Sequence, residues 1–342
     1  MKRFKRVFLT ALAVLMIITQ QGCAGKTAEP VVKQSFYFDT VCMISVYDME
    51  EMSEDNAQKA LDDAFALCSR YESLLSRTKE GTDIYRINHA GGKSVECDPE
   101  TVEVIRKGLY YSELSEGTFD ITIGRVSDLW DFHAEEPVVP SEGALREAAA
   151  TVDWRGVSVE GNTVTLANPE THIDLGGIAK GYIADKVSEN LRKSGVTSAI
   201  ISLGGNIVCI GDKRSGGSGE PFRIGIEKPY SQQAQILGSV DAVDQTVVTS
   251  GVYQRYFEAD GVRYHHILDA TTGYPAKSDI EGVTLKAADG KSADCDALAT
   301  IFLIMGEERA LAAVKEMDGI EAFIITTGGE KISTEGMGFT AQ

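Results

Sequence analysis

The sequence predicts an α+β protein, with a single composite domain in which mixed or antiparallel sheets are flanked by helices. Strand-like and helical segments are intermixed without the regular strand–helix alternation of a doubly wound sheet. No proline- or glycine-rich linker divides the chain, and 342 residues with 43% hydrophobic content suffice for one large core. We therefore expect the domain to occupy residues 35–342.

In the first half of the chain, alternation of apolar and polar residues predicts a strand over 36–47. The next segment, from 57 to 75, is an amphipathic helix whose apolar side chains recur at helical spacing. An aspartate–proline pair at 98–99 is a helix cap followed by proline at the first helical position. That helix is expected to run to about Glu116, where Gly117 can end it.

In the second half of the chain, strands and helices continue to alternate irregularly. The segment 182–187 after the glycine-rich stretch is expected to be helical, and Gly195 is expected to end that helix. A polar, glycine-rich stretch over 212–220 predicts a surface hairpin tip. The remaining expected strands are 162–166, 198–203, 222–227, 236–249, 261–268 and 322–326, and the remaining expected helices are 294–305 and 307–317.

The first 22 residues resemble a bacterial lipoprotein signal. A basic start is followed by an apolar run over 7–18 that is too short to span a bilayer. We expect cleavage before Cys23, lipidation of that cysteine, and a tether over 23–34 that holds the protein at the extracytoplasmic face of the bacterial cell membrane. Gln20 stands where such signals usually carry an aliphatic residue, so ordinary secretory cleavage is the alternative.

The composition excludes several classes of function. Removal of residues 1–22 takes away four positive charges and no negative one, so the net charge changes from −18 to −22. Such an acidic surface repels nucleic acids and anionic lipid head groups. The cysteines other than Cys23 are scattered and odd in number, which is not typical of a disulfide framework or a zinc site.

The segment 174–181 carries the strongest local signal for a ligand. Its adjacent glycines, Gly176 and Gly177, lie at a helix entry, where free N–H groups and the helix dipole favour an anion. Asp174 and Lys180 flank this bare backbone with one charge of each sign. The pattern suggests a phosphate-bearing ligand, with a metal, and a glycine-lined loop that merely packs tightly is the alternative. No complete P-loop or G-x-G-x-x-G motif occurs.

Two further groups of residues suggest a metal site and an acid/base group. Asp296 and Thr300 lie at i and i+4, so a helix places both oxygens on one face, where they suit Mg²⁺. The alternative is that Asp296 caps its helix and Thr300 bonds back to a carbonyl. The pair His265 and His266 offers an acid/base group, because the ordinary pKa of histidine lies near neutral pH. The alternative is that these side chains make only structural hydrogen bonds.

Together, these segments resemble the ApbE family of FAD:protein FMN transferases. The motifs occur in the family's order and spacing, from Phe38-Asp39-Thr40 to about Gly306. The segments that carry the resemblance are 115–122, 174–181, 249–255, 264–273 and 294–300.

The resemblance implies a role for particular residues. It implies that Asp296, Thr300 and the backbone carbonyl of Gly177 hold Mg²⁺, and that His266 is catalytic. The positions that would contact FAD are Thr118, Phe119, Asp120, Asp174, Lys180 and Ile267, together with Phe38, where many members have Met, and Thr78, where many have Tyr.

The resemblance also implies a reaction. A threonine or serine hydroxyl of an acceptor protein attacks the flavin-proximal phosphorus of FAD, and AMP leaves. Acceptors in this family are typically exported electron-transfer subunits, and we expect modification of such a partner in trans. Alternatives are a non-catalytic FAD-binding lipoprotein, a solute-binding lipoprotein, and an FAD pyrophosphatase in which water replaces the hydroxyl.

Overall fold

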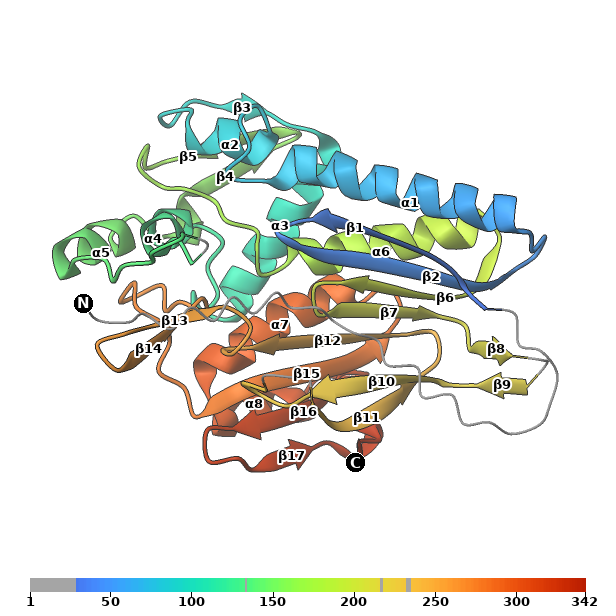
Figure 1. Cartoon of the computed structure of the whole chain (residues 1–342). Coiled ribbons are helices and arrows are strands. Elements are labelled where there is room, and N and C mark those ends of the chain that lie inside the picture. The colour runs from blue at the N-terminus through green and yellow to red at the C-terminus, as the bar shows by residue number, and fades with distance from the viewer. Residues whose placement is uncertain (1–28, 133, 216–217, 232–234) are drawn as a thin grey trace.

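The computed structural model describes residues 29–132, 134–215, 218–231 and 235–342 (Figure 1). The expected signal, Cys23 and the start of the expected tether lie outside this part of the chain. Among the described residues, no helix is both long and apolar enough to cross a membrane.

A long antiparallel sheet forms the centre of the molecule (Figure 1). Every neighbouring pair in this sheet is antiparallel. The α+β class with antiparallel sheets is therefore confirmed. Within the described residues the sheet has eight strands, in the order β1 (Val31–Tyr37), β2 (Thr40–Met49), β6 (Val196–Leu203), β7 (Asn206–Ile210), β12 (Gln245–Gly251), β15 (Ile280–Ala288), β16 (Glu321–Thr326) and β17 (Lys331–Ser333).

Helices cover one face of this sheet. The helices α6 (Ala179–Lys193) and α7 (Ser292–Met305) pack against each other and against its central strands, and α1 (Glu54–Leu75) packs on α6 and β1. Between these layers lies the largest hydrophobic core, which includes Leu61 and Phe302. The buried side chains of α1 are those expected from its helical spacing. The fold thereby brings the start of α6 next to α7.

A smaller antiparallel sheet covers the opposite face. It consists of β10 (Phe222–Glu227), β11 (Ile236–Ala242) and β18 (Thr340–Ala341). In β10, buried and exposed residues alternate strictly, as expected for a strand with one face in a core. Phe222 and Val240 from this sheet pack with Phe323 from β16 in a second core.

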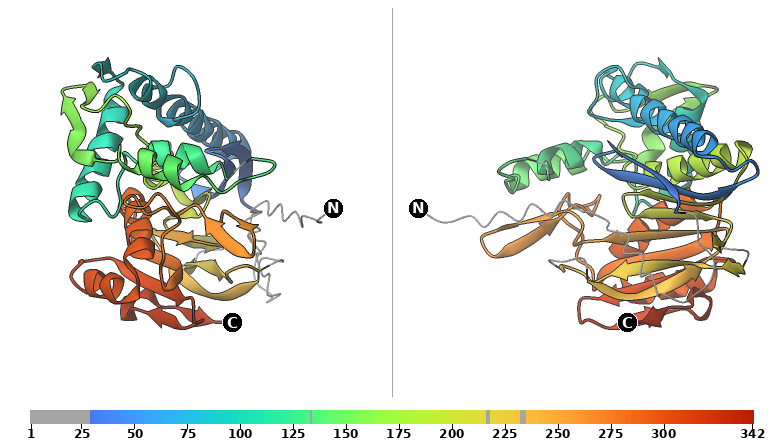
Figure 2. Two further views of the ribbon diagram at one scale, coloured as in Figure 1. Left: turned by 90° about the vertical axis from the view of Figure 1, so that its left-hand side faces the viewer. Right: turned by 45° about the vertical axis from the view of Figure 1, so that its right-hand side comes forward.

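An arm projects from one end of the sheet (Figure 2). It consists of α4 (Gly124–Trp130), α5 (Glu142–Ala149) and the hairpin of β13 (Tyr256–Ala259) and β14 (Val262–His265). Trp130 lies at its centre, packs against Phe257 and Tyr264, and donates a hydrogen bond from Nε1 to the carbonyl of Gly273 at 2.7 Å. This aromatic cluster fixes the hairpin that leads directly into His266.

Shorter elements complete the described chain. The helix α3 (Pro99–Leu114) begins as expected, because the side chain of Asp98 accepts from the N–H of Glu100. The other elements are α2 (Asp83–Asn88), α8 (Glu307–Lys315), β3 (Val95–Glu96), β4 (Val157–Glu160), β5 (Thr163–Leu166), β8 (Lys213–Ser215), β9 (Ser218–Glu220) and two short 3₁₀ turns at Trp154–Gly156 and Glu335–Met337.

Three strand predictions need correction. The expected strand 36–47 is a hairpin, in which Phe38 and Asp39 both have φ of 55° and form the two-residue turn between β1 and β2. The expected strand 236–249 is also two strands, separated by a turn in which Asp244 has φ of 49°. Finally, β1 begins at Val31, earlier than the expected strand start at residue 36. Alternation alone did not reveal these turns, because neither contains glycine.

Candidate active site

The start of α6 and the second turn of α7 meet at the carboxylate of Asp296. This carboxylate is only 2% exposed and accepts a hydrogen bond from the backbone N–H of Gly181 at 3.0 Å. The Nζ atom of Lys180 lies 3.3 and 3.4 Å from its two oxygens. Asp296 does not cap its own helix, whose N-cap Lys291 makes no side-chain cap hydrogen bond. It supplies instead an acceptor for an otherwise free N–H group in the first turn of α6.

A second aspartate makes this arrangement reciprocal. Asp185 on α6 accepts hydrogen bonds from the N–H groups of Ser292 and Ala293, at 2.9 and 3.0 Å, in the first turn of α7. Burial raises the pKa of Asp185 to about 6. The helices approach so closely that a Cβ atom at Gly181 would lie 2.2 Å from the carbonyl oxygen of Ser292. Each helix thus depends on a carboxylate from the other.

The glycine-rich entry is also closely packed against two residues of the expected site. A Cβ atom at Gly177 would lie 2.8 Å from Cε2 of Phe119 and 3.6 Å from Oγ1 of Thr300. The ring of Phe119 is 7% exposed. Gly177 is therefore required by the approach of these side chains rather than by a positive φ. The hydroxyl of Thr300 also lies 3.3 Å from the carbonyl oxygen of Asp296, as the capping alternative expected.

The donors gathered here fit a hard cation. Among the described residues, no three His, Cys, Asp or Glu side chains converge on a metal-sized site, so a metal would need hydroxyl or carbonyl ligands. Asp296 and Thr300 supply a carboxylate and a hydroxyl, and the backbone of Gly177, whose Cβ position would lie 3.6 Å from Oγ1 of Thr300, carries a further carbonyl oxygen. An all-oxygen set with one carboxylate suits Mg²⁺, which keeps waters or substrate phosphates as its other ligands.

At the other end of the entry, Asp174 is held by an arginine that the sequence analysis missed. The Nε atom of Arg77 lies 3.2 Å from Oδ2 of Asp174, and Oδ1 accepts from the N–H of Gly176 at 2.8 Å. Arg77 also pairs with Asp128. Burial alone would lower the pKa of Arg77, but these two carboxylates raise it above its usual value. Only the fold reveals this pairing, because Arg77 belongs to the loop after α1.

His266 follows β14 and is oriented by the backbone of Arg255. The carbonyl of Arg255 accepts from the backbone N–H of His266 at 3.1 Å and lies 3.2 Å from its Nδ1 atom. Because a carbonyl only accepts, this contact places the ring proton on Nδ1 and leaves Nε2 with a free lone pair. Burial, followed by the charge of Arg255, lowers the pKa of His266 to about 3. The imidazole is therefore neutral near pH 7.

The other expected flavin contacts differ in their surroundings. Asp120 is buried, and its oxygens accept from the N–H and hydroxyl of Thr122 at 2.8 and 2.7 Å and from the N–H of Trp154 at 3.1 Å. Burial raises the pKa of Asp120. This carboxylate therefore braces its own loop, which positions the neighbouring Thr118 and Phe119.

Three expected contacts lie in loops at the edge of the site. Phe38 is half-buried in the β1–β2 turn, and its N–H donates to Glu72 at 3.0 Å. Thr78 is exposed in the loop after α1, next to Arg77. Ile267 is buried and directly follows His266. The structure thus brings Gly177, Phe119, Lys180, Asp296 and Thr300 together, whereas Thr78 has no contact with this group among the described hydrogen bonds.

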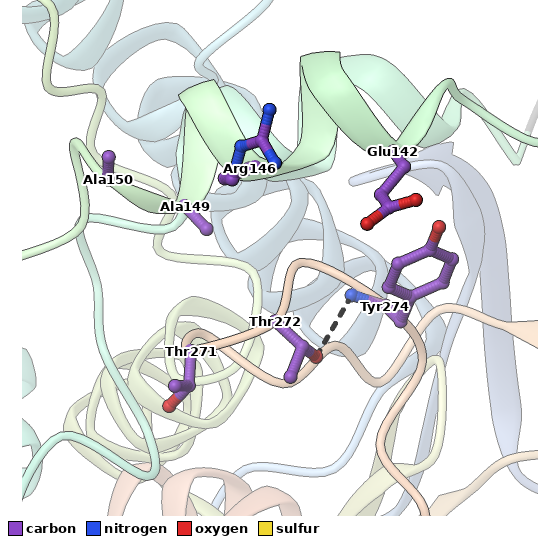
Figure 3. Close-up of a pocket in the computed structure, with 7 residues that line it drawn as sticks. All are labelled: Glu142, Arg146, Ala149, Ala150, Thr271, Thr272 and Tyr274. Atoms are coloured by element: carbon purple, nitrogen blue, oxygen red, sulfur yellow. Dashed lines mark hydrogen bonds between the residues drawn. The ribbon is translucent and has the colours of Figure 1, made fainter.

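A separate pocket of about 490 Å³ opens between α5 and the loop that follows Ile267 (Figure 3). None of the expected flavin or metal residues lines it. Within this loop, the N–H of Tyr274 donates to Oγ1 of Thr272 at 3.3 Å. The residues that line the pocket are Glu142, Arg146, Ala149, Ala150, Thr271, Thr272 and Tyr274.

The fold resembles that of solved ApbE proteins. The structure matches the ApbE protein of Thermotoga maritima MSB8 with a TM-score of 0.80 and 30% identity, covering 90% of this chain and 98% of that one. It matches the flavin transferase ApbE of Vibrio cholerae with a TM-score of 0.79 and 28% identity, covering 90% and 98% of the two chains.

The sequence relatives lead to the same family. The FAD:protein FMN transferase of Treponema pallidum is 36% identical over 299 residues, which is 84% of this chain and 82% of that protein. The one of Vibrio cholerae serotype O1 is 32% identical over 330 residues, covering 94% and 93%. The ApbE family model matches residues 38–324. This chain belongs to the ApbE family.

Proposed function

We propose that this protein is an FAD:protein FMN transferase, which moves FMN from FAD to a threonine or serine hydroxyl of an acceptor protein and releases AMP. The observation that carries the proposal is the convergence of Asp296, Lys180 and Thr300 at the glycine-lined start of α6. Such a wall offers oxygen ligands for a cation and positive charge for a pyrophosphate within one small region. The curated relatives carry the same activity in their names.

His266 is the group placed to accept the hydroxyl proton. Its Nδ1–H is engaged by the carbonyl of Arg255, so Nε2 has a lone pair available. As the acceptor oxygen forms its bond to the flavin-proximal phosphorus, the hydroxyl proton moves to Nε2. The bond from that phosphorus to the bridging oxygen breaks, and its electron pair leaves with AMP. The low pKa of His266 keeps Nε2 unprotonated at neutral pH.

Electrostatic stabilisation comes from the start of α6. Lys180 lies at the first turn with its ammonium group beside Asp296, and the helix dipole adds partial positive charge there. Mg²⁺ held by Asp296, Thr300 and the Gly177 carbonyl would neutralise the phosphate charge that grows in the transition state. Phe119, packed on Gly177, offers an aromatic surface to a flat ring.

The proposal includes a location and a partner. We propose that Cys23 is lipidated and anchors the enzyme at the extracytoplasmic face of the cell membrane, where exported electron-transfer subunits are its acceptors. Metabolic labelling with a radioactive fatty acid tests the anchor. The wild-type protein should incorporate label and Cys23→Ser should not, whereas equal labelling of both would contradict lipidation at this residue.

One experiment tests the activity itself. The mature protein is incubated with FAD and candidate exported electron-transfer proteins, with Mg²⁺ or with EDTA, and the products are separated on a denaturing gel. Flavin fluorescence on an acceptor band, present with Mg²⁺ and absent with EDTA, is the expected result. Release of AMP and free FMN without a fluorescent band would favour the pyrophosphatase, and tight FAD binding without cleavage would favour the non-catalytic binder.

A further inference from the structure

The guanidinium of Arg255 is a charged group without a partner in the described part of the chain. Arg255 is half-buried, and among the described residues no hydrogen bond or ion pair involves its side chain. Burial lowers the pKa of Arg255, and the more distant carboxylates Asp39 and Asp174 only partly restore it. A guanidinium carries five donors, and none of those of Arg255 is used by the described part of the protein, so they are open to solvent or to a ligand.

The nearby carboxylate is already engaged by a different arginine. Asp174 pairs with Arg77 at 3.2 Å and also accepts from the N–H of Gly176. Arg77 gains a second partner in Asp128. Two arginines therefore lie near Asp174, and only one of them is satisfied by the protein. The donors of Arg255 remain available for an anion that the protein does not supply.

The position of Arg255 indicates which anion this is. The backbone carbonyl of Arg255 accepts from the N–H of His266 at 3.1 Å and lies 3.2 Å from its Nδ1 atom, so the residue that carries the guanidinium adjoins the proposed base. The charges of Arg255 and Lys180 both lower the pKa of His266, so both cations act electrostatically on the imidazole. An anion bound by Arg255 would therefore lie near the group that is proposed to deprotonate the acceptor hydroxyl.

We propose that Arg255 binds the flavin-proximal phosphate of FAD, the phosphate that is transferred, and so fixes the attacked phosphorus against His266. This assignment rests on the proposed transferase function. A guanidinium matches two phosphate oxygens with two parallel N–H bonds, which a lysine ammonium does not reproduce. Arg255 is thus a substrate-binding residue supplied by the segment before β13, whereas Lys180 is supplied by α6.

The test compares ligands that differ only in phosphate. Affinities of the wild type, Arg255→Met and Arg255→Lys for FMN, riboflavin and AMP are measured by calorimetry in the presence of Mg²⁺. Arg255→Met should weaken FMN binding by about ten- to a hundred-fold, as expected for lost charge-assisted hydrogen bonds, and leave riboflavin and AMP unchanged. Arg255→Lys should fall between the two for FMN only. If Arg255→Met does not fold, the lysine variant carries the same comparison.

Arg223→Met is the matched control, because Arg223 is an exposed arginine that pairs with Asp241 on the small sheet. It should bind all three ligands as the wild type does. Unchanged FMN affinity in Arg255→Met would overturn the proposal, as would equal weakening of FMN and riboflavin, or weakening of AMP alone. Failure of the wild type to transfer FMN from FAD would instead contradict the proposed function, and that result is read in a separate assay.

Discussion

The carboxylate of Asp296 on α7 accepts the backbone N–H of Gly181 on α6 at 3.0 Å, so the expected metal ligand is also a structural link between two helices. Asp185 on α6 makes the reverse connection, because its carboxylate accepts hydrogen bonds from two backbone N–H groups of α7. This reciprocal capping holds the glycine-rich entry against the face of α7 that carries Thr300. The proposed metal site and the packing of the two helices therefore share residues.

Asp296→Asn separates these two roles. The amide oxygen of asparagine can still accept from Gly181, but the charge that faces Lys180 and Mg²⁺ is lost. We expect thermal unfolding within a few degrees of the wild type and no detectable FMN transfer. In Asp296→Ala, the buried N–H loses its acceptor, which should cost an additional destabilisation of about 1–3 kcal/mol. Full transfer by either variant would rule out the metal assignment.

Gly181→Ala tests the closeness of the two helices. The added Cβ would lie 2.2 Å from a backbone oxygen of α7, which cannot rotate away. We expect a loss of about 3 kcal/mol in urea unfolding, from overpacking. Gly143→Ala in α5 is the control, because nothing lies within 4 Å of its Cβ position, and it should stabilise by about 0.5 kcal/mol. Equal stability of the two variants would contradict the packing described.

His266→Asn tests the proton transfer. The affinity for FAD, measured by flavin fluorescence quenching, should stay within about three-fold of the wild type, because the proposed role is chemical. The rate of transfer should fall by about a hundred-fold or more, in the range of general-base catalysis. A variant that transfers FMN at the wild-type rate would refute the role of this histidine.

Acidification should destabilise the protein through the two adjacent histidines. Burial lowers the pKa of His265 to about 4 and that of His266 to about 3, below the ordinary value of 6.5. At pH values between the lowered pKa of the folded protein and 6.5, these histidines bind more protons in the unfolded chain than in the folded protein. Stability that is present at pH 7 is therefore lost as the pH falls towards 4. Urea unfolding at pH 7 and pH 5 should show a loss on the order of 1 kcal/mol per histidine.

The double variant His265→Asn/His266→Asn isolates this contribution. It should lose less stability than the wild type over the same interval. Asp185, with its pKa raised to about 6, has the opposite sign and loses stability as the pH rises towards 6, but it is present in both proteins. The same pH dependence in the wild type and the double variant would contradict the burial of the histidines.

Local patterns predicted the helices with clear caps and spacing. The helix opened by Asp98 and the amphipathic α1 agree with the structure because their signals lie within the helix itself. The hairpin turn at Phe38 and Asp39 was missed, since neither residue is typical of the positive φ that the turn requires. The strand β15 was not predicted at all, although it is central to the sheet.

The motifs indicated which residues to consider for the site, but they did not predict the hydrogen bonds and ion pairs that connect those residues. Asp296 and Gly181 are separated by more than a hundred positions, so only the packing of α6 on α7 reveals their hydrogen bond. The pairing of Arg77 with Asp174 likewise depends on how the loop after α1 folds over the glycine-rich entry. The free guanidinium of Arg255 is recognisable only once its surroundings are known.

The most direct test of the account follows AMP and covalently bound FMN in the same reaction. A purified acceptor, FAD, Mg²⁺ and the enzyme are sampled over time, with AMP quantified by chromatography and the acceptor by intact mass. The account predicts one AMP for each acceptor that gains one FMN, with both products formed at least about a hundred-fold more slowly by His266→Asn and not formed in EDTA. AMP accompanied by free FMN and an unmodified acceptor would contradict it.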